Sequence, residues 1–148
     1  MDVALKEAQA AGYAEADPTY DIKGIDTACK LVILANWLMG LNVTLRDVDV
    51  QGITEITLNR IAEARAKDCN VKLIGTIDYK LSVRPQLIEM THPLSVSGTL
   101  NAVAFKTEHS GEITIVGKGA GGTETAGAIL RDLIEIRRSV FGYQGGLL

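Results

Sequence analysis

The chain has 148 residues, of which 47% are hydrophobic and 22% are charged, and its formal net charge is −3 at pH 7. This length and balance predict one globular domain with a core of its own. The acidic charge and the low share of aromatic residues, 5%, argue against a nucleic-acid partner, which needs clustered cations or stacking rings.

Helical spacing and stop signals predict three helices in the first half of the chain, at residues 2–11, 25–39 and 54–67, the last capped by Thr54. The second helix is the most apolar, and we assign residues 37–39 to its core. The polar segment 13–24 predicts a loop. Residues 41–50 alternate like a strand, and a change of phase near Asp47 predicts a bulge.

Alternating apolar residues in the second half predict strands at residues 70–81, 83–89, 101–108 and 112–117, the last two paired as a hairpin around Ser110-Gly111. Pro85 lacks an N–H group and predicts a sheet edge or a bend. A last helix is expected at 124–138 with an apolar stripe facing inward, followed by a flexible glycine-rich tail at 141–148. The order of elements predicts an α+β domain over residues 1–140, with a mixed sheet and helices packed on one face.

The longest fully apolar run, Leu31 to Ala35, is too short to cross a bilayer, and Trp37 to Met39 follow only after Asn36, so we expect no association with a membrane. The two cysteines, Cys29 and Cys69, lack metal-ligand spacing, so we expect no metal site. Nothing after Met1 resembles a signal peptide, which favours reduced thiols and a cytoplasmic location.

A glycine-rich segment near the end of the chain reads ITIVGKGAGGTETAGAIL. Its Gly117-x-Gly119-x-x-Gly122 matches the dinucleotide-binding pattern GxGxxG. That pattern belongs to a βαβ unit, and here no second strand follows the helix, since only about ten residues remain after Arg138. The chain therefore lacks the main nucleotide-binding fold. The segment is either a tight turn or a helix start whose N–H groups approach a ligand.

A second segment, GYAEADPTYDIKGIDTACK, places charged groups close together. Asp26 and Lys30 lie four residues apart on a predicted helix and therefore share one face. Such a pair is most often a solvated ion pair. Here, however, the helix is otherwise apolar, and the loop before it carries Glu15, Asp17 and Asp21. This group could bind a substrate with an ammonium group, while the lysine carries a proton.

This second segment resembles the catalytic domain of homoserine dehydrogenases, in which the pattern GYAE-x-DP-x-x-D-x-x-G-x-D-x-x-x-K carries substrate and proton-transfer groups. The matching positions are Gly12, Tyr13, Ala14, Glu15, Asp17, Pro18, Asp21, Gly24, Asp26 and Lys30. Residues 92–103 and 117–133 resemble further family segments in the right order. The resemblance implies interconversion of L-homoserine and L-aspartate 4-semialdehyde with NAD or NADP, in threonine and methionine biosynthesis.

The resemblance also assigns roles to individual residues. Lys30 would be the general acid/base at the substrate oxygen, with Asp26 beside it to orient the substrate or a water. The substrate would be bound by Glu15, Asp21 and Tyr13. The glycine turn would touch the cofactor near its nicotinamide, through Gly119, Ala120, Gly121 and Gly122.

The family begins with a nucleotide-binding domain, which this sequence does not contain. The implied partners are therefore that N-terminal domain, which would hold most of the NADP or NAD, the small-molecule substrate, and a second copy in a homodimer. We expect the chain alone to be inactive. Two alternatives stay open: a non-enzymatic amino-acid-binding or dimerisation module, and a sibling amino-acid dehydrogenase with another substrate.

Overall fold

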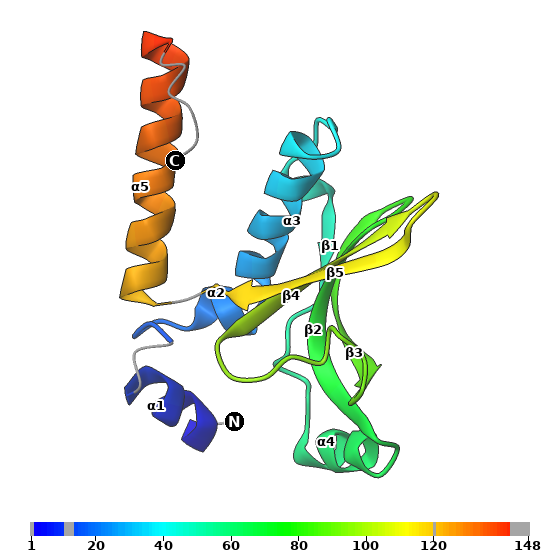
Figure 1. The fold of residues 1–148 in the computed structure, drawn as a ribbon. Helices are drawn as coiled ribbons and strands as arrows, with labels where there is room; N and C mark the ends of the chain where they lie inside the picture. The colour runs from blue at the N-terminus through cyan, green and yellow to red at the C-terminus, as the bar shows by residue number, and fades with distance from the viewer. Residues whose placement is uncertain (1, 11–13, 120, 143–148) are drawn as a thin grey trace. The chain divides into compact units, whose positions relative to one another are not determined.

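The computed structural model describes residues 2–10, 14–119 and 121–142, and the chain divides into two compact units, Met1–Ser95 and Val96–Leu148. Figure 1 shows a three-stranded sheet with helices in the first unit, and a two-stranded ribbon and a long helix in the second. The α+β class is therefore confirmed. The assignment of one domain and a tail stays a prediction, since most of the tail lies outside the described residues.

The first unit is built around a mixed sheet with strand order β1-β3-β2. Its elements are α1 (Asp2–Ala10), α2 (Thr19–Ile22), α3 (Ile25–Trp37), the 3-10 turn η1 (Leu45–Asp47), β1 (Val48–Val50), α4 (Leu58–Arg65), β2 (Cys69–Ile77) and β3 (Leu81–Glu89). The central strand β3 pairs antiparallel with β2 along its whole length. It pairs parallel with β1 only as far as Val83.

The core of the first unit lies between α3 and this sheet. Its buried residues are Ala28, Leu31 and Ala35 of α3 with Val48, Leu81 and Val83 of the strands. The three- and four-residue spacing places the helical members on one side of α3. Gly75 of β2 allows α3 to come close, because an added Cβ would lie 3.1 Å from Cδ1 of Leu31 and 3.2 Å from Cγ2 of Thr27.

The second unit holds β4 (Leu100–Thr107), β5 (Gly111–Lys118) and α5 (Gly122–Phe141). The two strands pair antiparallel, as the sequence predicts. The hydroxyl of Thr107 closes the turn between them: it donates to the Gly111 carbonyl at 2.8 Å and accepts from the Ser110 N–H at 3.0 Å.

The predicted strand at 41–50 is wrong over most of its length, because only β1 is a strand there. The residues before it form η1, which Thr44 and Asp47 hold in a reciprocal cap. The Asp47 carboxylate accepts from the Thr44 N–H at 2.7 Å and from its hydroxyl at 2.9 Å. These side-chain hydrogen bonds compete with the backbone hydrogen bonds that would join residues 44–47 to a neighbouring strand. The change of phase near Asp47 is therefore a capped turn and not a bulge.

Two other boundaries differ from the prediction. Helix α4 begins after Thr57, whose hydroxyl accepts from the Arg60 N–H at 3.2 Å, and not after Thr54. The strand predicted at 70–81 ends at Ile77, and a turn leads directly into β3. Pro85 lies in β3 beyond the last residue paired with β1, so its missing N–H faces a local edge, as predicted.

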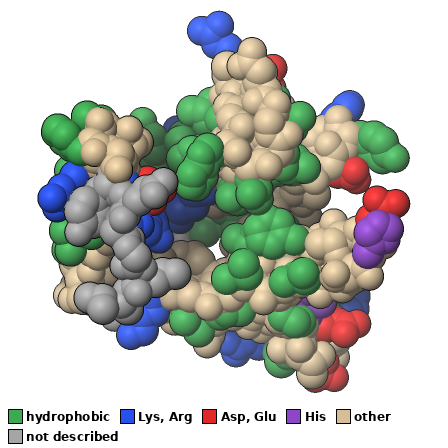
Figure 2. All heavy atoms as spheres, turned by 45° about the horizontal axis from the view of Figure 1, so that its top comes forward, with side chains coloured by type: hydrophobic (Ala, Val, Ile, Leu, Met, Phe, Trp, Pro, Cys, Tyr) green, Lys and Arg blue, Asp and Glu red, His purple; other side chains and the backbone are tan. Residues whose placement is uncertain are grey.

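The residues assigned to the core at the end of α3 are exposed. The exposed fractions are 88% for Trp37, 58% for Leu38 and 55% for Met39. The inward stripe predicted for the last helix stays a prediction, because α5 belongs to the second unit and has no buried residue within that unit. Figure 2 shows many hydrophobic side chains on the face in view. Within the first unit, the apolar end of α3 is therefore left exposed.

The cap at η1 predicts a pH-dependent contribution to stability. The backbone N–H and the hydroxyl of Thr44 hold the pKa of Asp47 below its ordinary value. Since the folded pKa is the lower one, the carboxylate stabilises the fold above its unfolded pKa, and this effect is lost as pH falls through the folded pKa. Asp47→Asn should therefore lower stability to urea at pH 7 but much less below both pKa values. An equal loss at both pH values would contradict this explanation.

Candidate active site

The position of the predicted acid–base pair depends on a glycine at the start of α3. Gly24 has a φ of 78°, a left-handed conformation that glycine adopts at little cost, and it is buried against the sheet. A Cβ there would lie 3.2 Å from Cγ1 of Val83 and 3.4 Å from Cγ1 of Val50. The Gly24 N–H donates to the Asp21 carbonyl at 3.1 Å. Gly24 therefore lets the chain leave α2 and start α3 directly over the strands.

Asp26 and Lys30 are brought together as the sequence predicts. Nζ of Lys30 lies 2.8 Å from Oδ2 of Asp26, and the two side chains are 57% and 45% exposed. An exposed pair of this kind contributes only a few tenths of a kcal/mol to stability. Its accessible atoms can instead donate to and accept from a small polar molecule. The pair is thus open on the side of α3 that faces away from the sheet.

The three acidic residues before α3 are exposed, but one of them is already hydrogen-bonded to the start of α2. The carboxylate of Asp17 accepts from the Thr19 hydroxyl and N–H at the start of α2, and these bonds lower its pKa. Asp17 is therefore engaged as a local cap. Glu15 and Asp21 have exposed side chains and can reach a ligand. Tyr13 lies outside the described residues, and all three substrate roles stay predictions.

The glycine turn lies in the second unit, between β5 and α5. Gly121, just before α5, has a φ of 134°, and an added Cβ would lie 2.2 Å from Oε2 of Glu124. At Gly122 a Cβ would meet nothing within 4 Å. Gly119 donates its N–H to the Thr99 carbonyl at 3.5 Å. The backbone at Gly122 is therefore open to a ligand, whereas Gly121 is covered by a carboxylate; Ala120 lies outside the described residues.

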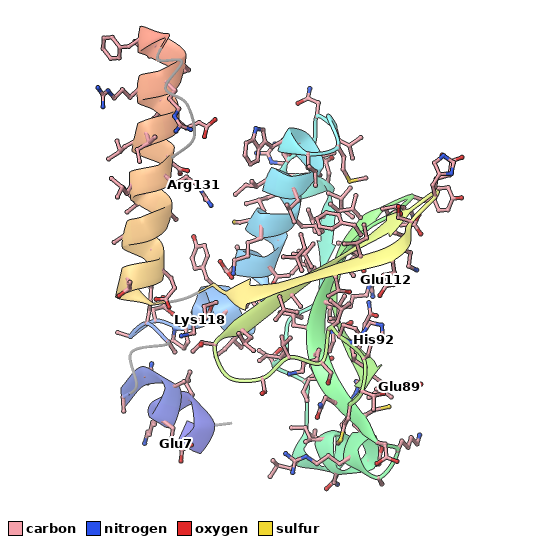
Figure 3. All side chains as sticks on the ribbon, viewed as in Figure 1. Glu7, Glu89, His92, Glu112, Lys118 and Arg131 are labelled. Carbon is pink, nitrogen blue, oxygen red and sulfur yellow. The ribbon has the colours of Figure 1, made fainter. Side chains whose placement is uncertain are left out.

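A charged pair that the sequence analysis did not identify lies beside the glycine turn. Oε1 of Glu124 is 3.9 Å from Nζ of Lys118, and both line an open hollow of about 560 Å³ together with Arg131. Figure 3 shows Lys118 at the end of β5 and Arg131 on α5. Lys118 and Glu124 are six positions apart and separated by glycines, so their spacing matches neither the period of a helix nor that of a strand. Only the geometry of the turn reveals that they meet.

A hollow in the first unit has a different character. It measures about 710 Å³, and leucine and isoleucine are the commonest residues in its lining, which comes from α1, α2, the segment before α4, α4 and β2. No aspartate or glutamate lines it, so it offers no carboxylate for acid–base chemistry. Within the described ranges, no cluster of three or more His, Cys, Asp or Glu could hold a metal ion. No described helix combines the length and apolarity needed to span a membrane.

Comparison with known proteins identifies the family. The family profile for homoserine dehydrogenase matches residues 1–134, which include the Asp26–Lys30 pair and the glycine turn.

The chain belongs to the homoserine dehydrogenase family.

Three relatives of the chain carry the same family name. A homoserine dehydrogenase of Methanocaldococcus jannaschii is 51% identical over 140 residues, which are 94% of this chain and 42% of that protein. An NAD(+)-dependent homoserine dehydrogenase of Pseudomonas canavaninivorans is 46% identical over 143 residues, covering 92% of this chain and 41% of that protein. The structure of a hyperthermophilic archaeal homoserine dehydrogenase mutant in complex with NADPH matches with a TM-score of 0.74 at 30% identity, covering 96% of this chain and 40% of the other.

The chain therefore spans about two fifths of the length of these homoserine dehydrogenases. The family is one of oxidoreductases in amino-acid biosynthesis. The names of two relatives include a nicotinamide nucleotide, once as NAD(+) and once as NADPH.

Proposed function

We propose that this chain is the substrate-binding and acid–base part of an enzyme that interconverts L-homoserine and L-aspartate 4-semialdehyde, in the biosynthesis of threonine and methionine. The observation that carries the proposal is the accessible Asp26–Lys30 pair, 2.8 Å apart, in a chain whose family is homoserine dehydrogenase. A pure binding module would not need a proton carrier at this position.

The geometry suits proton transfer to and from the substrate oxygen. A bound nicotinamide cofactor would supply the hydride acceptor for the alcohol or the hydride donor for the aldehyde. In the direction of oxidation, the amine of Lys30 takes the hydroxyl proton, and in reduction it returns a proton to the same oxygen. Asp26 orients the lysine through their 2.8 Å contact. Glu15 and Asp21 would bind the substrate ammonium group, with Tyr13 lining the pocket.

The cofactor would meet this chain at Gly119, Ala120, Gly121 and Gly122. The open backbone at Gly122, where an added Cβ meets nothing within 4 Å, fits a close approach by a flat ring. The names of two relatives support NAD or NADP as the cofactor and leave the choice between them open. An N-terminal nucleotide-binding domain would hold most of the cofactor, in line with the greater length of the relatives.

The enzyme is proposed to be a cytoplasmic homodimer. The ribbon of β4 and β5 supports a second copy, because an isolated two-stranded hairpin is marginal in water. Val103 and Ile115 are opposite each other in its register and are 36% and 60% exposed. An apolar face on a narrow ribbon favours burial against another sheet.

A chimeric enzyme tests the proposed substrate. We define the chimera as the M. jannaschii relative in which this chain replaces the matching 140-residue segment. L-homoserine should be oxidised with a kcat/KM about 10-fold or more above those of L-serine and L-threonine, since the pocket must discriminate by a methylene or a branch. A preference for another amino alcohol would indicate a sibling dehydrogenase. Homoserine binding without cofactor reduction would indicate a binding module.

A further inference from the structure

The short helix α2 depends on other segments for its position. It has four residues, Thr19–Ile22, whereas isolated helices shorter than about 12 residues are marginal in water. None of these four residues is buried, so no side chain of α2 anchors it in the core of the first unit. The position of α2 matters because it carries Asp21, one of the exposed acids before α3.

Residues 51–53, which follow β1 and which we call the 51–53 strap, provide a contact that holds α2. The Gln51 N–H donates to the Val83 carbonyl of the central strand at 2.8 Å. Two residues later, the Ile53 N–H donates to the Ile22 carbonyl, also at 2.8 Å. The strap thus joins the end of α2 to the strand against which α3 packs.

Gly52 lies between these two hydrogen bonds and lets the strap come close to α2. An added Cβ would lie 2.3 Å from the Ile22 carbonyl oxygen and 2.7 Å from Cα of Lys23. Both are backbone atoms, so no side-chain rotation could make room for the Cβ. A residue with a side chain at position 52 must therefore push the last turn of α2 away from the strap. Asp21 lies in that turn, directly before Ile22.

The acid–base pair is held by a different set of contacts. Asp26 and Lys30 are carried by α3, which packs on the sheet through its own buried residues. A displacement of the end of α2 would therefore move Asp21 more than it moves the pair. The 51–53 strap thus controls where Asp21 stands relative to Asp26 and Lys30.

We propose that Gly52 is a positioning residue, which through the 51–53 strap holds Asp21 where it binds the ammonium group of the substrate. This inference rests on the proposed function, in which Asp21 binds that group while Lys30 moves the proton at the hydroxyl oxygen. Gly52 acts through Asp21 and does not touch the reacting atoms. Loss of the close approach should therefore weaken recognition of the ammonium group more than it slows proton transfer.

Steady-state kinetics of the chimera measure this recognition with two substrates. One is L-homoserine, and the other is 4-hydroxybutanoate, which keeps the hydroxyl and the carboxylate but lacks the ammonium group. Gly52→Ala should lower the ratio of kcat/KM for homoserine to kcat/KM for 4-hydroxybutanoate about 10-fold, mainly through a higher KM for homoserine and with a smaller fall in kcat.

Ala64→Gly is the matched control for a general loss of stability. Ala64 is buried on α4, outside α2 and the strap, and glycine within a helix is destabilising. Its substrate ratio should equal that of the parent chimera. An unchanged ratio in Gly52→Ala, or an equal fall in Ala64→Gly, would overturn the inference.

A double substitution shows whether Gly52 acts through Asp21. If it does, Gly52→Ala combined with Asp21→Asn should give about the same substrate ratio as Asp21→Asn alone, since the contact that Gly52 supports is already lost. Independent effects would instead multiply. A double variant whose ratio falls by the product of the two single effects would therefore overturn the inference.

Amide hydrogen exchange in the 148-residue chain tests the strap without any activity. The reporters are the N–H groups of Ile22, Lys23 and Gly24, whose hydrogen bonds close the last turn of α2. A hydroxy-acid analogue of isoleucine at position 53 removes only the N–H that donates to the Ile22 carbonyl, which should leave the fold intact. Exchange at the reporters should then rise several-fold, while exchange in the middle of α3 should not change.

The exchange result separates the strap from the proposed function. Unchanged exchange at all three reporters would overturn the inference even in a chimera that oxidises homoserine. If the reporters respond but the parent chimera oxidises no homoserine, the proposed function is refuted and with it the role of Asp21, whereas the strap itself stands.

Discussion

Replacing Lys30 by alanine is expected to lower kcat for homoserine oxidation by the chimera about 10²- to 10⁴-fold, with a small change in KM. The reason is that general acid/base catalysis by a positioned side chain contributes rate factors of about this size. Steady-state kinetics at saturating cofactor measure both parameters. A kcat within about threefold of the parent would show that Lys30 is not the proton carrier.

Lys30→Arg provides a matched control for the ion pair. Arginine keeps the positive charge opposite Asp26, but its guanidinium does not lose a proton in proteins. If Lys30 transfers a proton, Lys30→Arg should lose turnover about as severely as Lys30→Ala. If Lys30 only neutralises the charge of Asp26, Lys30→Arg should retain most of the turnover of the parent chimera. Lys80→Ala, at an exposed lysine in the turn between β2 and β3, should leave kcat unchanged.

Replacing Gly52 by alanine is expected to destabilise the first unit by about 1–3 kcal/mol, the usual cost of forcing an extra methyl group into a packed site. An added Cβ would lie 2.3 Å from the Ile22 carbonyl oxygen and 2.7 Å from Cα of Lys23. These are backbone atoms that cannot rotate away. The adjacent Ile53 N–H donates to the same carbonyl at 2.8 Å, so the two segments are joined at the point where the methyl would intrude.

Urea unfolding of the isolated chain measures this loss as a lower transition midpoint at an unchanged slope. Gly117→Ala is the matched control, because a Cβ there would meet nothing within 4 Å. In the chimera, Gly52→Ala should also reduce activity, since the end of α2 leads through Gly24 into the helix that carries Lys30. A urea midpoint for Gly52→Ala equal to that of Gly117→Ala would contradict the close approach of Gly52 to the backbone of Ile22 and Lys23.

Local signals predicted some elements well. Helix α3 and the β4–β5 hairpin follow from apolar spacing, from a glycine at each helix end, and from Ser110-Gly111 at the turn. The Asp26–Lys30 pair follows from spacing alone, because residues four apart on a helix must share a face. In each case the information lies within a few residues along the chain.

Other features depend on contacts that local patterns do not encode. An apolar helix suggests burial on all sides, yet only the side of α3 that meets the sheet is buried, and Trp37 is exposed. The spacing of apolar residues along α5 likewise identifies an apolar side of that helix but not the partner that covers it. The alternation at 41–50 was overridden by the reciprocal cap between Thr44 and Asp47. The Glu124–Lys118 pair depends on the path of the glycine turn.

The most direct test of the proposed function compares homoserine-dependent reduction of NAD(+) and NADP(+) by the 148-residue chain and by the chimera. We expect no rate above the blank for the chain alone and clear turnover for the chimera, because acid–base groups without a bound nicotinamide have no hydride acceptor. Turnover by the pure chain would contradict the need for a separate nucleotide-binding domain. A folded chimera that binds cofactor but leaves homoserine unoxidised would contradict the assignment of Asp26 and Lys30 as its acid–base pair.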